Sequence, residues 1–443
     1  MKLKNSLIKK YIRLKNYILG LLSYFKFRLG DNQELYYKDL YYLSFFSKDI
    51  FLAKKTEIIN KNLLSLKKKT SCNVGIVIYT TSMWSIERLY SLLDEDPAYN
   101  PTILVVPFTD ATDKTFQITT VFFKDNKYCV KTFYDSNFCV NDYDLLIYTN
   151  PYISTDKYIN LLDIGVDKLV AYVSYSYMLS DNLEKLELPI YLLSWKFFSD
   201  SVFYKEIIES KSRIYTGNAV FCGYPKMDGY YKSKVEKDSI INKKVIIYAP
   251  HQSVNRSEIR YATFEKNGWF LLFLAEKYKS SILWIVKPHP LLRSHSVEAG
   301  LFNDESSYDD YLKCWQDTNA AKVLENGDYF DLFKESDAMI TDSVSFLAEY
   351  QFTGKPLLML DSGKQRLNDF GESIKNILYQ CRGNDYGRIE QFVRDVIDEN
   401  DPMKKYRMDF FNKNLSYTNG HDNLACDNIY KIFNKEIYNI DTV

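Results

Sequence analysis

Short runs of β-branched and aliphatic residues recur along the chain, separated by longer stretches with helical periodicity. Such runs are typical of strands in parallel sheets that are covered on both faces by helices. The first series of predicted strands comprises residues 73–79, 102–107, 144–148 and 168–173. The second comprises residues 244–249, 281–286, 338–340 and 355–360, with helices predicted at 263–278, 331–336 and 346–352. Two such series predict an α/β protein with two Rossmann-like domains.

The N-terminal 30 residues have a different pattern, with apolar side chains at steps of three and four residues and basic groups between them. The apolar positions are Leu3, Leu7, Tyr11, Leu14, Ile18, Leu22 and Phe25. This spacing predicts an amphipathic helix with a cationic face. The helix either lies on an anionic membrane surface or packs on the protein body with its basic side in solvent. Aromatic-rich helical material follows.

The 443 residues are too many for a single core, so we expect several domains. The helical, membrane-associating segment covers residues 1–70. An N-terminal Rossmann-like domain covers 71–230, and a C-terminal Rossmann-like domain covers 240–385. Polar helical sequence at 386–443 is expected to form C-terminal helices.

Charge and cysteine content restrict the class of protein. The formal net charge is zero, which argues against a protein that coats nucleic acid. The first 30 residues nevertheless hold eight basic groups and no acidic group, so the remainder is net acidic. The seven cysteines are scattered and never form a CxxC pair, as expected in a reducing compartment. Since no apolar run is long enough to span a bilayer, we expect a cytoplasmic protein, peripheral on the inner face of the membrane.

Two histidines of the second series occupy equivalent positions. His251 follows one predicted strand and His289 follows the next, and each is flanked by proline. In an open parallel sheet the carboxyl ends of the strands face the ligand crevice, which favours a binding role over a structural one for His289. For His251 the two roles are equally favoured.

The loop Thr341-Asp342-Ser343-Val344-Ser345 ends a strand and opens a helix. Hydroxyl groups and backbone N–H groups at such a position can bind a diphosphate, although Asp342 or Ser343 could simply cap the helix. Glu349 lies two turns further on, where its carboxylate could accept hydrogen bonds from a ribose. Signatures of other chemistries, such as GxGxxG, GxxxxGK[ST], HExxH and GxSxG, are missing from the expected places. We therefore expect neither a metal nor a cofactor beyond a nucleotide-linked donor substrate.

Taken in order, four segments resemble the CDP-glycerol glycerophosphotransferase family of teichoic-acid and capsule polymerases. The segments are Gly223-Tyr-Pro-Lys-Met-Asp228, Val245-Ile-Ile-Tyr-Ala-Pro250, Val286-Lys-Pro-His-Pro290 and Ser336-Asp-Ala-Met-Ile-Thr-Asp-Ser-Val-Ser345. The resemblance implies a glycosyltransferase-B fold of two Rossmann-like domains, in which the domain of residues 71–230 binds the acceptor and the domain of residues 240–385 binds the nucleotide donor. It also implies that His289, Thr341, Asp342 and Ser345 meet the CDP diphosphate and that Glu349 approaches the ribose. We expect four further residues to take part in donor binding: His251, Lys287, Ser343 and Lys226.

The chain departs from that family in its N-terminal half. The family's WHG tripeptide, whose histidine is taken as the catalytic base, is replaced by Ala171-Tyr-Val-Ser-Tyr-Ser-Tyr177, which contains no histidine. In the helix-opening loop Ser343 stands for the family's Tyr and Val344 for its Ser. The candidates for the catalytic base are therefore Asp110, Asp163 and the tyrosines of 172–177. We take Asp110 as the catalytic candidate, together with His289 on the donor side.

The resemblance predicts an enzyme that moves a glycerol- or ribitol-phosphate type of group from a CDP-linked donor to a cell-surface glycan or lipid-linked acceptor. One alternative is a glycosyltransferase of the same fold that uses a CMP-, UDP- or GDP-linked sugar in capsule or lipopolysaccharide synthesis. The other is an inactive nucleotide-binding scaffold, an option that the missing histidine keeps open.

Overall fold

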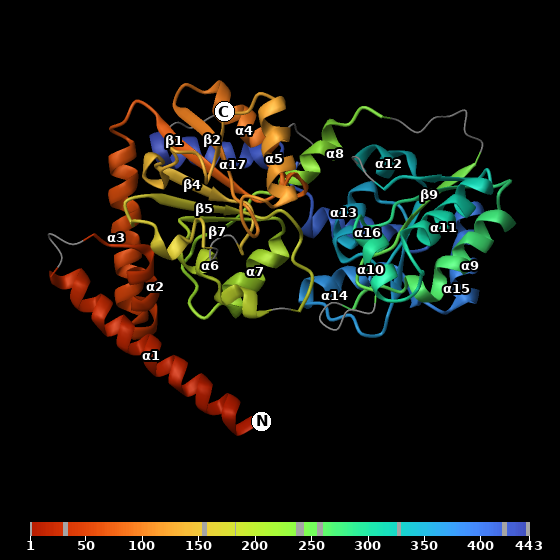
Figure 1. Ribbon diagram of the computed structural model, residues 1–443, viewed down its shortest axis with the longest axis horizontal. Helices are drawn as coiled ribbons and strands as arrows, with labels where there is room; N and C mark the ends of the chain where they lie inside the picture. Colours follow the sequence, from red (N-terminus) through yellow and green to blue (C-terminus); the bar gives the residue numbers. More distant parts are fainter. Residues whose placement is uncertain are drawn as a thin grey trace. The chain divides into compact units, whose positions relative to one another are not determined.

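The computed structural model describes residues 2–29, 34–152, 157–181, 183–235, 243–254, 260–325, 329–418 and 423–439. The chain divides into two compact units. The first unit comprises Met1–Ser176, Leu183–Asp228 and Tyr417–Val443, and the second comprises Tyr177–Asn182 and Gly229–Ser416. Each unit contains one parallel sheet with helices against it, which confirms the predicted α/β class (Figure 1).

The first unit is built on a seven-stranded sheet of order β3-β2-β1-β4-β5-β6-β7. All its neighbouring strands pair in parallel, and the strands are β1 Cys72–Ile78, β2 Tyr99–Val105, β3 Val130–Thr132, β4 Leu145–Tyr148, β5 Leu169–Val173, β6 Lys196–Ser199 and β7 Ala219–Phe221. Its helices are α1 Lys2–Leu29, α2 Tyr37–Phe46, α3 Lys48–Leu66, α4 Glu87–Glu95, α5 Lys114–Asp125, α6 Pro189–Leu193, α7 Val202–Lys211 and α17 Ala425–Phe433. The long apolar strands β1 and β2 are almost completely buried, as their sequences require.

The second unit is built on a six-stranded parallel sheet of order β10-β9-β8-β11-β12-β13. The strands are β8 Lys244–Ala249, β9 Ile282–Val286, β10 Ala321–Val323, β11 Ala338–Thr341, β12 Leu357–Asp361 and β13 Tyr379–Arg382. The helices are α9 Phe264–Lys277, α10 Leu292–Glu298, α11 Glu305–Asp317, α12 Phe330–Glu335, α13 Val344–Glu349, α14 Asp369–Lys375, α15 Tyr386–Ile397 and α16 Lys404–Asn414, and the short α8 Asp228–Lys232 begins at the boundary of the units. The strand order reverses between β8 and β11, which is where ligands bind in open α/β sheets.

The N-terminal helix is present as predicted, and it contacts the first unit along only part of its surface. Gly20 allows α1 to approach α2 closely, because a Cβ at this position would lie 2.5 Å from the carbonyl oxygen of Tyr42. Lys26 forms an ion pair of 2.7 Å with Asp39 of α2. Many of its apolar side chains are exposed; Tyr11 is 68% exposed and Leu14 is 60% exposed. In Figure 1 the N-terminal part of α1 (red) extends away from the rest of this unit.

The segment Gly223–Asp228 contacts Tyr417 and the start of α17 within the first unit. Gly223 has a φ of +93°, and a side chain there would collide with the ring of Tyr417. The buried carboxylate of Asp228 accepts hydrogen bonds from the N–H groups of Ala425 and Cys426 at the start of α17, each 2.9 Å long. It also accepts one of 3.0 Å from the Tyr417 hydroxyl. The helices predicted at 386–443 therefore belong to both units: α15 and α16 are part of the second unit and α17 is part of the first.

Replacing Asp228 with Ala is expected to lower the free energy of unfolding by roughly 2–4 kcal/mol, because three buried donors lose their acceptor and α17 loses its N-terminal partner. The measurement is urea unfolding followed by circular dichroism. Asp317→Ala removes an exposed carboxylate instead and should change the stability by less than about 0.5 kcal/mol. Equal stability of the two variants would contradict this role for Asp228.

Candidate donor-binding site

Asp342 organises the carboxyl edge of the second sheet. It follows β11 and is 3% exposed. One carboxylate oxygen, Oδ1, accepts a hydrogen bond of 2.6 Å from the N–H of His251, in the loop after β8. The other, Oδ2, accepts from the N–H of Thr263 at 2.5 Å and from its hydroxyl at 2.8 Å, directly before α9. Burial raises the pKa of Asp342 to about 7. Because both oxygens are engaged by the protein, Asp342 positions the surrounding loops.

Thr341 contributes to the same arrangement, and two serines follow it. The Thr341 hydroxyl donates to the carbonyl of Ala249 at 2.7 Å and accepts from the N–H of Ser343 at 2.9 Å. Ser343 and Ser345 are half-buried in the first turn of α13, and their hydroxyls bond to no other described residue. Since α13 has only six residues, these hydroxyls and the N–H groups of the turn are its main means of binding an anion.

The two histidines predicted from sequence lie together. The ring centroids of His251 and His289 are 5.8 Å apart. Nδ1 of His289 accepts a hydrogen bond of 3.1 Å from the N–H of Leu291, and Nδ1 of His251 accepts one of the same length from the N–H of Ser253. The neutral form of each ring therefore carries its proton on Nε2, where it can be donated to a ligand.

Both imidazoles are neutral at physiological pH. Burial is the main cause that lowers the pKa of His251 to about 3 and that of His289 to about 4. Repulsion between positive charges adds to the effect: protonation of His289 or His295 would disfavour protonation of His251, and positive charge on His295 or Lys287 disfavours protonation of His289. The pair acts as neutral hydrogen-bond donors rather than as imidazolium cations.

The remaining predicted donor residues are distributed as follows. Glu349, at the end of α13, is 1% exposed and accepts a hydrogen bond of 2.6 Å from the hydroxyl of Tyr329. Lys287 is half-buried between β9 and His289. Lys226 is part of the first unit, whereas all other predicted donor residues are part of the second. Among the described residues, no group of three or more His, Cys, Asp or Glu side chains is placed to hold a metal ion.

The predicted base candidates occupy the first unit, except Tyr177, which belongs to the second. Asp110 is exposed in the loop after β2, where it accepts hydrogen bonds from the N–H (2.8 Å) and hydroxyl (2.6 Å) of Thr112. These bonds lower the pKa of Asp110, which weakens it as a base. Asp163 is exposed as well, 3.9 Å from Lys38. Tyr172 is buried against Phe197, and burial raises its pKa far above the usual value.

Sequence reasoning missed Asp200, which follows β6 at the carboxyl edge of the first sheet. Its Oδ1 accepts a hydrogen bond from Ser201, while Oδ2 has no partner among the described residues. Burial raises the pKa of Asp200 to about 7, within the range suited to proton transfer. The side chain is only 1% exposed, so it does not reach solvent in this structure. Its only sequence signal is its place after the short strand Lys196–Ser199.

The histidine pair should make the protein sensitive to acid. At these two histidines the unfolded chain binds protons near the ordinary pKa of 6.5, whereas the folded chain does so only near 3 and 4, so their contribution to stability falls as the pH drops from about 6.5 to 4. Replacing His251 with Gln should reduce the loss of unfolding free energy between pH 7 and pH 5 by roughly 1–2 kcal/mol. Urea unfolding at the two pH values, followed by tryptophan fluorescence, measures this. An unchanged loss in the variant would show that His251 titrates normally.

Comparison with solved structures shows the fold. The wall teichoic acid polymerase TagF aligns with a TM-score of 0.54 and 14% identity, over 88% of this chain and 97% of TagF. MnaA of S. aureus, determined with UDP, aligns with a TM-score of 0.53 and 15% identity, over 84% of this chain and 98% of MnaA. UDP-GlcNAc 2-epimerase from Neisseria meningitidis aligns with a TM-score of 0.51 and 14% identity, over 83% of this chain and 100% of the epimerase. The fold is of the glycosyltransferase-B type.

Sequence comparison shows the family. A search of curated proteins found no match. The sequence profile of the family described as CDP-Glycerol:Poly(glycerophosphate) glycerophosphotransferase matches residues 149–423, more than half of the chain. This range contains the Asp342 loop, the histidine pair and the Gly223–Asp228 segment. The chain therefore belongs to the CDP-glycerol:poly(glycerophosphate) glycerophosphotransferase family and is a transferase that takes glycerophosphate from CDP-glycerol.

Proposed function

We propose that the diphosphate of CDP-glycerol binds at the carboxyl edge of the second sheet, against His251, His289 and the hydroxyls of Ser343 and Ser345. The observation that carries this proposal is the histidine pair, in which both rings accept a backbone N–H at Nδ1 and so present Nε2–H. Lys287 adds a positive charge beside His289. A solved TagF structure soaked with CDPG, with a TM-score of 0.52 and 13% identity over 96% of this chain and 98% of TagF, supports a CDP-linked donor.

In the proposed reaction an acceptor hydroxyl attacks the phosphorus that carries the glycerol. A new P–O bond to the acceptor forms, the P–O bond to the cytidylate phosphate breaks, and CMP leaves. The Nε2–H groups of His251 and His289 stabilise the negative charge that develops on the leaving phosphate. The proton of the acceptor hydroxyl passes to a general base, for which Asp110 stays a candidate despite its lowered pKa. In this proposal the reaction needs no metal or further cofactor.

We further propose that the acceptor is a cell-surface glycan or a lipid-linked precursor, and that α1 holds the protein on the inner face of the membrane. None of the described helices is long and apolar enough to cross a bilayer. The support comes from α1, whose exposed apolar side chains are interspersed with exposed basic groups, as in helices that lie in a lipid interface.

Replacing His289 with Ala should weaken CDP binding roughly tenfold, because a hydrogen bond to a charged phosphate is lost. Cytidine carries the same base and ribose without phosphate, so its affinity should change less than about twofold. Isothermal titration calorimetry with the two ligands measures this. If both ligands lose affinity equally, His289 does not meet the diphosphate.

The double variant Leu14→Ser/Leu22→Ser should reduce binding to phosphatidylglycerol vesicles at least about tenfold, since two exposed leucines no longer enter the lipid. The matched control, Ile118→Ser/Val121→Ser, removes two exposed apolar side chains from α5 of the same unit and should bind as the wild type does. Vesicle co-sedimentation provides the measurement, and high salt should weaken wild-type binding. Equal binding by both double variants would remove α1 as the anchor.

A further inference from the structure

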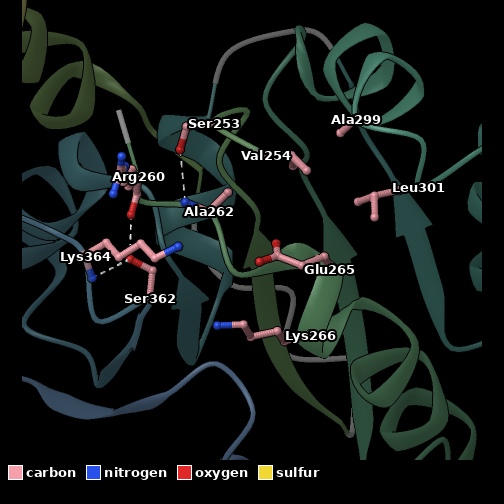
Figure 2. Close-up of a pocket in the computed structure, with 10 residues that line it drawn as sticks. All are labelled: Ser253, Val254, Arg260, Ala262, Glu265, Lys266, Ala299, Leu301, Ser362 and Lys364. Carbon is pink, nitrogen blue, oxygen red and sulfur yellow. Dashed lines mark hydrogen bonds between the residues drawn. The ribbon is translucent and has the colours of Figure 1, made fainter. Parts of the chain in front are cut away.

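The second unit contains a cavity of about 440 Å³ at the carboxyl edge of its sheet. Its walls come from the loop after β8, the start of α9, the loop after α10 and the loop after β12 (Figure 2). The walls are joined by hydrogen bonds, since the Ser362 hydroxyl donates to the carbonyl of Arg260 at 2.5 Å and the N–H of Ala262 donates to the Ser253 hydroxyl at 3.0 Å. None of the family-motif residues of the donor site lines this cavity.

Positive charge prevails in the cavity. Among the described residues that line it are Lys266, Lys364 and Arg260, against one acidic residue, Glu265. Neither Lys266 nor Lys364 forms an ion pair with any described residue, and both side chains are exposed. Figure 2 shows their ammonium groups pointing into the space between them. Two unpaired ammonium groups facing one space indicate an anionic ligand.

The rest of the lining restricts the kind of anion. Val254, Ala299 and Leu301 form an apolar wall opposite Lys364 (Figure 2). Among the described residues that line the cavity, none has an aromatic ring on which a nucleobase could stack. An anion with a small aliphatic body therefore fits this lining better than a nucleotide base does.

The cavity is linked to the histidine pair through Ser253. The Ser253 hydroxyl lies 2.9 Å from Nδ1 of His251, and its N–H donates to the same nitrogen. Ser253 also lines the cavity. The cavity and the proposed diphosphate site are therefore adjacent, with Ser253 in contact with both.

We propose that this cavity binds a phosphate group carried on a polyol, with Lys266 and Lys364 pairing with the phosphate and the apolar wall contacting the carbon chain. This inference rests on the proposed function. A polyol phosphate has two sources in that reaction: the phosphodiester units of an acceptor chain and the glycerol phosphate end of the donor. The chemistry recognised is the same in both cases.

The test uses the full chain and the double variant Lys266→Gln/Lys364→Gln. Its dissociation constant for a synthetic glycerol phosphate oligomer should rise at least about tenfold, because two cations are lost, while that for CDP stays within about twofold. The control Lys313→Gln/Lys322→Gln removes two exposed, unpaired lysines elsewhere in the same unit and should leave both constants unchanged. Leu301→Trp narrows the cavity without changing charge and should also weaken oligomer binding. Melting temperatures verify that the variants fold.

Steady-state kinetics separate the two sources. A raised KM for the acceptor assigns the cavity to the acceptor chain, and a raised KM for CDP-glycerol with unchanged CDP affinity assigns it to the donor end; both support the proposal. Unchanged oligomer binding together with an unchanged KM for CDP-glycerol, or an equal loss of affinity for CDP and for the oligomer, would overturn it. The proposed diphosphate site is tested by a separate measurement, the affinity of the wild type for CDP and its change in the His289→Ala variant.

Discussion

The edge of the second sheet depends on one buried carboxylate. Asp342 accepts three hydrogen bonds from two points of the chain, His251 and Thr263, which lie 91 and 79 residues before it. A buried carboxylate is stable only when donors surround it, so the loop after β8 must return to the end of β11 at both points. This requirement fixes the backbone of His251 and the start of α9.

The consequences of that arrangement extend in two directions. Towards β9, the fixed loop places His251 beside His289 and buries both rings enough to keep them neutral. Towards β12, the same loop carries Ser253 and Ala262 into the wall of the cavity with Lys266 and Lys364. In the two proposals, the neutral histidines donate hydrogen bonds to the diphosphate, while the ammonium groups of Lys266 and Lys364 pair with a separate phosphate. Stabilisation of developing charge and recognition of a charged group would then fall to different residues at the same edge of the sheet.

The sequence was sufficient for the framework of both sheets, because strands such as 73–79 and 244–249 are continuous apolar runs. It was insufficient for β3, β6, β7, β10 and β13, which have three or four residues and in most cases include a polar one, so that no periodicity can be recognised. His251, His289 and the Asp342 loop were found because each follows a recognisable strand. The inward orientation of Asp342 could not be foreseen, since its partners are distant in the chain. Lys266 and Lys364 carry no recognisable signal in the sequence, because they become neighbours only when the fold brings the start of α9 and the loop after β12 together.

The Gly223–Asp228 segment has a consequence for how the protein is made. The second unit is nearly continuous in sequence, from Gly229 to Ser416, whereas the first needs Tyr417 and α17, which follow the second unit in the chain. Domains generally fold as units while the chain emerges from the ribosome, N-terminal ones first. Here the order is mixed: the seven strands of the first sheet are made first, the second unit follows, and the carboxylate of Asp228 meets its partners only after Tyr417 and the start of α17 have been made. A chain that stops before Tyr417 would contain every strand of both sheets, but Asp228 would have none of these three donors.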